Sequence, residues 1–165
     1  MDQIAVYLEK LGYEVEDQGK IKRFLLVLKD GLPIGFILQD FTVKMISGED
    51  TQKYDMLQRI VSFVRTNQHL QTAGQGNAEY IVITYRGNQL TTFFDLKTGQ
   101  ERYAVYIVND SGEVSSTIPT FDTYDAAIRE FISQTGMIDL KAAAAKEPLH
   151  IRWRRQLVKH LMKGM

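Results

Sequence analysis

The sequence predicts an α+β fold in which two small antiparallel-sheet lobes each carry a long helix. Two observations lead to this prediction: short apolar segments are joined by tight turns, and each half of the chain ends in a segment with helical spacing of apolar residues. We expect the lobes over residues 1–70 and 79–136. A polar, glycine-containing linker is expected over residues 71–78, and a basic helical tail over residues 137–165.

The first lobe is expected to contain two helices with strands between them. Apolar residues recur at helical spacing in residues 2–11, which predicts a short amphipathic helix. Residues 47–50 can cap a second, longer helix that is expected to end near Leu70. The apolar stripe of this second helix consists of Leu57, Ile60, Val61 and Val64.

The strand predicted over residues 21–29 is apolar on both faces. Its alternating side chains are Leu25 and Val27 on one face and Phe24, Leu26 and Leu28 on the other. A strand of this kind is usually central in a sheet or covered on both sides. The Asp30-Gly31 pair predicts a hairpin into the next strand, and Pro33 indicates that this returning strand lies at an edge or starts late.

The second lobe is expected to be a meander of strands closed by a helix. The strands are predicted over residues 80–85, 90–96, 103–108 and 114–118, and the helix follows from about residue 122 to residue 134.

The two lobes also resemble each other, which indicates a duplicated strand-hairpin-helix unit. Residues 23–30 have the same character as residues 102–109, and in both cases a turn, a strand and a helix follow. The alternative is a chance resemblance between two hairpin-plus-helix segments.

Composition narrows the class of protein further. Of the 165 residues, 44% are hydrophobic, which is enough for a packed core, and the absence of cysteine excludes disulfides and thiolate chemistry. No stretch approaches the roughly 18 consecutive apolar residues that a membrane span needs. The start Met1-Asp2-Gln3 lacks the layout of a secretory signal. We therefore expect a cytoplasmic protein without a membrane span.

The net charge of zero hides an uneven distribution. Residues 141–165 contain seven Lys or Arg and one acid, Glu147, so this segment carries a net charge of +6. Because the whole chain is neutral, residues 1–140 carry −6. Such an asymmetry favours an electrostatic contact, either with an external polyanion or with the acidic surface of the protein itself.

The candidate binding residues lie in this basic tail. Pro148 suits the first turn of a helix, and at about 100° per residue a cationic stripe gathers within about 80° of the helix surface. The stripe consists of Arg152, Arg155, Lys159 and Lys163. Arg154 interrupts the apolar side of this helix. Trp153 is expected to pack on the acidic body, residues 1–140, or on a partner.

The remaining polar residues predict no catalytic, cofactor or metal site. His69, His150 and His160 are the only imidazoles, and their spacing matches no metal-binding motif. Acids gather at the predicted start of the second helix, where they stabilise the helix dipole.

These observations predict a non-catalytic binding or adaptor protein that docks on a protein or nucleoprotein partner through its basic helix and acidic body. One form of this hypothesis is an inhibitor of a nucleic-acid-processing complex. The first alternative is a DNA- or RNA-binding protein that follows phosphates with the cationic stripe. The second is a hydrolase with an Asp/Glu site that only the fold assembles. The oligomeric state is left open.

Overall fold

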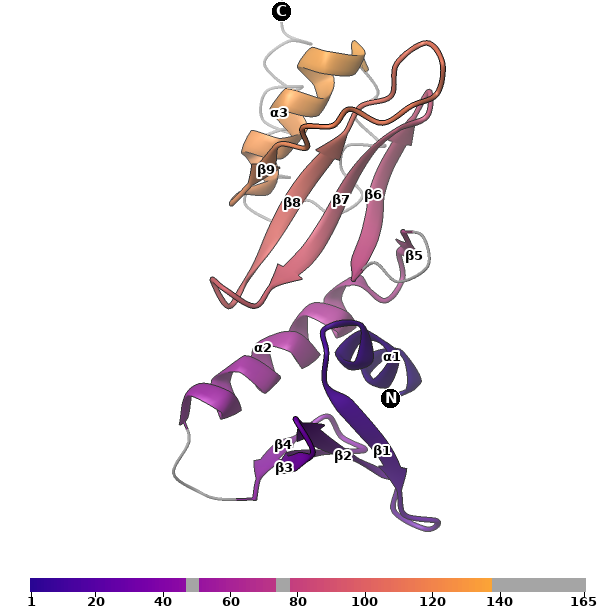
Figure 1. The fold of residues 1–165 in the computed structure, drawn as a ribbon. Coiled ribbons are helices and arrows are strands. Elements are labelled where there is room, and N and C mark those ends of the chain that lie inside the picture. The colour runs from indigo at the N-terminus through magenta and orange to yellow at the C-terminus, as the bar shows by residue number, and fades with distance from the viewer. Residues whose placement is uncertain (47–50, 74–77, 138–165) are drawn as a thin grey trace, which may run out of the picture. The chain divides into compact units, whose positions relative to one another are not determined.

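A computed structural model describes residues 1–46, 51–73 and 78–137 of the chain. The chain divides into two units: unit 1 is Met1–Tyr80 with Phe93–Glu101, and unit 2 is Ile81–Thr92 with Arg102–Met165. The described residues form three helices and two antiparallel sheets of four and five strands. This confirms the predicted α+β class (Figure 1).

The sheet of unit 1 has the strand order β1-β2-β3-β4, and neighbouring strands are antiparallel. Its strands are β1 (Glu14–Gln18), β2 (Phe24–Lys29), β3 (Leu32–Leu38) and β4 (Val43–Met45). The helices α1 (Asp2–Lys10) and α2 (Thr51–Asn67) lie on one side of this sheet (Figure 1).

The core of unit 1 lies between these helices and the four-stranded sheet, and Tyr80 and Phe94 also belong to it. The buried residues of α2 include all four members of the predicted apolar stripe, together with Phe63. From the sheet, the core receives Leu25, Val27, Ile34, Ile37 and Val43. Burial of a side chain of this size typically contributes about 1.5–3 kcal/mol, so the helix-facing side of the sheet is a main source of stability for unit 1.

Pro33 lies within β3, which is not an edge strand of the sheet. It pairs with Leu28 of β2, next to a bulge between Val27 and Leu28. On its other side β3 pairs with β4 only through residues 35–37. The prediction that this strand lies at an edge or starts late was therefore wrong, since β3 lies between β2 and β4 and begins at Leu32. Proline is tolerated there because β4 is short and leaves Pro33 with a strand neighbour on one side only.

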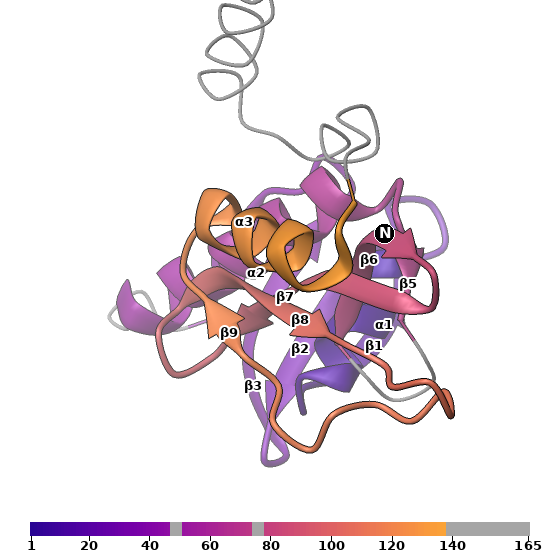
Figure 2. The same ribbon diagram turned by 90° about the horizontal axis from the view of Figure 1, so that it is seen from above.

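The five-stranded sheet has the order β5-β6-β7-β8-β9. Its strands are β5 (Gln71–Thr72), β6 (Glu79–Tyr85), β7 (Asn88–Asp95), β8 (Gln100–Tyr106) and β9 (Thr120–Phe121). In unit 2, α3 (Tyr124–Thr135) lies beside β8 and β9 (Figure 2), and the Tyr103 and Tyr124 rings meet edge to face at 5.7 Å. Thr123 caps α3 by accepting a hydrogen bond from Ala126 N.

The strand predicted over residues 114–118 is not formed. Val114 makes only an isolated bridge to Val108, and β9 pairs with β8 instead, through Tyr103 with Phe121 and Ala104 with Thr120. Residues 119–121 thereby occupy the edge of β8 that the predicted strand would have needed.

The finer sequence predictions on organisation stay predictions. Gln71 and Thr72 of the expected linker form β5, and residues 74–77 lie outside the described residues. Apart from the buried Met137, the predicted tail lies outside them too. The duplicated unit and the boundaries at residues 70, 79 and 136 likewise stay predictions.

Candidate functional site

The binding residues predicted from the sequence lie outside the described part of the chain. They are Arg152, Trp153, Arg154, Arg155, Lys159 and Lys163. Within the described ranges, no three His, Asp or Glu side chains gather closely enough to hold a metal ion. No described helix is long and apolar enough to cross a membrane.

The described residues offer a different candidate, which is the face of the unit 1 sheet that points away from α1 and α2. Strand alternation sends Leu25 and Val27 of β2 into the core, so the neighbouring side chains of β2 point to the opposite face. Alternation in β3 does the same for the residues on either side of Ile37. We call this surface the open face. Its half-buried apolar members are Phe24, Leu26, Phe36 and Leu38, and Leu28, on the same side of β2, is buried.

The apolar side chains of the open face form cross-strand pairs. Phe24 pairs with Leu38, and Leu26 pairs with Phe36. The rings of Phe24 and Phe36 meet edge to face, with centroids 5.8 Å apart and an interplanar angle of 80°. All four side chains are half-buried, although both helices of unit 1 lie on the other side of the sheet.

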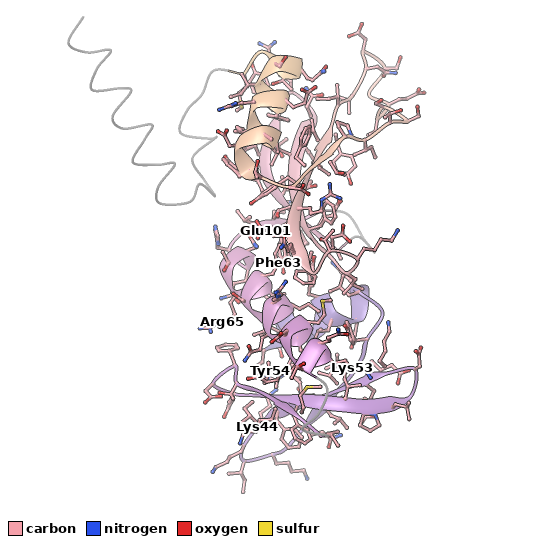
Figure 3. All side chains as sticks on the ribbon, turned by 90° about the vertical axis from the view of Figure 1, so that its left-hand side faces the viewer. Lys44, Lys53, Tyr54, Phe63, Arg65 and Glu101 are labelled. Carbon is pink, nitrogen blue, oxygen red and sulfur yellow. The ribbon has the colours of Figure 1, made fainter. Side chains whose placement is uncertain are left out.

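Charged residues border the open face at its two outer strands. Glu16 of β1 pairs with Leu26, and Lys44 of β4 pairs with Phe36. One row across the sheet therefore reads Glu16, Leu26, Phe36, Lys44. Both charged residues are exposed, and Lys44 lies on the side of the sheet away from α2 (Figure 3). Three strand spacings separate the backbones of Glu16 and Lys44 by about 14 Å.

Sequence reasoning found only part of the open face. It recognised that Phe24, Leu26 and Leu28 form a second apolar face of one strand. It did not place Phe36 or the two charged residues beside them. The available signal was the Asp30-Gly31 hairpin, which brings the next apolar segment alongside β2, but the bulge at Val27/Leu28 shifts the register that a simple hairpin would give.

A cavity near α1 is a weaker candidate. Its volume is about 190 Å³, below the about 300–1,000 Å³ typical of small-molecule sites. It is lined by Asp2, Gln3, Val6, Tyr7, Lys10, Gln68, Leu70, Thr72 and Tyr80.

The two tyrosines of that cavity are built into the core. Tyr7 Oη donates a hydrogen bond to the Ala78 carbonyl at 2.6 Å and accepts one from Phe94 N at 3.0 Å. Burial raises the pKa of Tyr7, against the opposing effect of the Phe94 hydrogen bond, and burial raises the pKa of Tyr80 to about 12. Both phenols are protonated at neutral pH, as a tyrosine of ordinary pKa already is.

Polar contacts elsewhere in unit 1 hold segments together. Arg23 forms salt bridges with Asp2 of α1 and with Asp17 of β1. Arg59 of α2 donates a hydrogen bond to the Gly99 carbonyl in the β7–β8 turn at 3.0 Å. The Arg23–Asp17 contact closes the β1–β2 turn, and the contacts of Arg23 with Asp2 and of Arg59 with Gly99 join elements that lie further apart in the sequence. These contacts explain Arg23 and Arg59 without a ligand.

Comparison with protein-family models, with curated proteins and with solved structures finds no match to this chain.

Proposed function

We propose that this chain is a non-catalytic binding or adaptor protein of the cytoplasm, which contacts other protein surfaces through the open face and through its basic tail. The observation that carries the proposal is the open face. Apolar side chains on both faces of β2 favour cover on both sides, and within unit 1 the described helices cover only one. Half-buried apolar surface that contains aromatic residues and has a charged rim is typical of protein interfaces.

The basic tail supplies the second contact in this proposal. As an amphipathic helix, residues 149–163 would present the cationic stripe to an acidic partner surface, while Trp153 and the leucines pack against apolar groups. Residues 1–140, with a net charge of −6, would repel the same acidic surface, so that surface would contact the tail, while the open face would contact apolar protein surface. Nucleic acid is the other polyanion that the stripe could follow.

The open face is tested by photo-crosslinking in cells that express the full-length chain. A photoreactive phenylalanine analogue at position 36 is expected to crosslink to a protein. The matched control carries the same analogue at Ile21, which is 95% exposed in the β1–β2 turn. We expect no comparable crosslink from position 21. Absence of any protein crosslink from position 36 would remove the open face from the function.

The tail is tested by charge reversal in the full-length chain. Arg152→Glu together with Arg155→Glu is expected to lower the amount of co-purifying protein at least about ten-fold, because two attractive contacts become repulsive. The matched control, Lys20→Glu with Lys22→Glu, makes the same change of charge in the exposed β1–β2 turn. If the unaltered chain, the tail variant and the control recover equal amounts of co-purifying protein, the tail has no role in docking. Recovery that depends on nucleic acid, and is lost after nuclease treatment, would replace the adaptor by a nucleic-acid-binding protein.

A further inference from the structure

We infer that the occupant of the open face is a second copy of this chain, bound face to face about a two-fold axis that runs parallel to the strands. This inference rests on the proposed function, in that it names the protein partner of the same surface.

The charges at the two edges of the open face determine the direction of this axis. A two-fold axis parallel to the strands reverses the order of the row, so Glu16 of one copy lies over Lys44 of the other, and the reverse pair forms at the opposite edge. An axis across the strands would place Glu16 over Glu16. Because like charges in contact are strongly disfavoured, the first arrangement is selected. Glu14, which shares this face of β1, also lies at the edge that meets β4 of the other copy.

The same two-fold rotation also places apolar residues of the two copies opposite each other. Leu26 lies over Phe36 of the other copy, and Phe24 lies over Leu38, so each aromatic ring meets an aliphatic side chain. Sheets that pack face to face keep their strands within about 30° of each other at a distance of about 10 Å. The second copy would thus cover the side of β2 that α1 and α2 leave open.

The dimensions of the face indicate a weak dimer. Four strands at about 4.8 Å and a six-residue β2 at about 3.3 Å per residue outline a footprint of about 400 Å². A stable interface buries about 800 Å² on each partner. We therefore expect a dimer that dissociates in the micromolar range or above and that presents two basic tails to one partner, which raises the affinity through multivalency.

The test is sedimentation velocity of the full-length chain between low and high micromolar concentration. The unaltered protein is expected to shift from monomer to dimer, and Leu26→Glu is expected to remain a monomer at every concentration. Glu16→Lys and Lys44→Glu should each weaken dimerisation about ten-fold, since each creates two like-charge contacts. The double variant that carries both changes should return to within about three-fold of the unaltered protein. Glu9→Lys on α1, an exposed charge away from this face, is the matched control and should change nothing.

The outcomes separate this inference from the proposed function. A chain that is monomeric throughout, yet crosslinks from position 36 to a different protein, overturns the second copy and leaves the adaptor role standing. A dimer that is insensitive to both single charge reversals uses another surface and also overturns the inference. If the double variant does not regain the dimerisation affinity of the unaltered protein, the two-fold axis does not run parallel to the strands. If Leu26→Glu does not fold, as judged by circular dichroism, the charge variants still decide the question.

Discussion

Replacement of Phe63 by alanine is expected to lower the free energy of unfolding by about 3–5 kcal/mol. Phe63 is 5% exposed and lies in the C-terminal half of α2, near Glu101 (Figure 3). Its ring contacts three other aromatic rings of unit 1, with centroid distances of 5.3 Å to Tyr7, 5.7 Å to Tyr80 and 6.0 Å to Phe94. The alanine variant loses these contacts and leaves a cavity that the surrounding rings fill only in part.

Denaturant unfolding followed by circular dichroism measures this effect. The matched control is Ile21→Ala, because Ile21 is 95% exposed and its truncation is expected to change stability by less than about 0.5 kcal/mol. A loss below about 1 kcal/mol in the Phe63→Ala variant would show that the aromatic cluster does not stabilise unit 1 as described.

Replacement of Tyr7 by phenylalanine removes a single oxygen atom and is expected to cause the second large loss of stability. The hydroxyl of Tyr7 satisfies two backbone groups at once, the carbonyl of Ala78 and the N–H of Phe94. Each buried backbone group that loses its partner costs about 1–3 kcal/mol. We therefore expect the Tyr7→Phe variant to lose at least about 1 kcal/mol of stability, although its ring packing is unchanged.

The same denaturation measurement checks this prediction, with Tyr54→Phe as the control. The Tyr54 hydroxyl accepts a hydrogen bond from Gln58 Nε2 at 2.6 Å at an exposed position, so its removal is expected to change stability by less than about 0.5 kcal/mol. Equal stability of the two variants would mean that water replaces the Tyr7 hydroxyl, and the proposed buried bridge would be wrong.

These contacts also explain how segments distant in the sequence come together in unit 1. Tyr7 and Phe94 are 87 positions apart, and the stacked rings of Tyr7 and Tyr80 lie 5.5 Å apart. A helix at the start of the chain thus becomes part of the same core as β7. The sequence contained no signal that α1 would pack against residues 80 and 94. Its patterns report the local periodicity of apolar residues, and they do not identify the segment against which each face packs.

Within each unit, local patterns predicted the types of element well. Helical spacing predicted α1 and α2, and the alternation in residues 21–29 predicted β2 together with its second apolar face. The strand over residues 114–118 failed because propensity cannot tell which of two neighbouring segments will pair with β8. Thr120 and Phe121 took that place. The prediction from Pro33 of an edge strand or a late start failed for a related reason, since the proline is tolerated only because β4 is short.

For this protein, the sequence by itself determined the α+β class, the uneven distribution of charge and the existence of a strand that is apolar on both faces. These properties follow from composition, turn residues and side-chain alternation, which act over a few neighbouring residues. Only the tertiary structure decided that α1 and α2 share one side of the sheet, and that Glu16, Leu26, Phe36 and Lys44 stand in one row. Register and helix placement depend on pairing between distant segments, and no local pattern encodes that pairing.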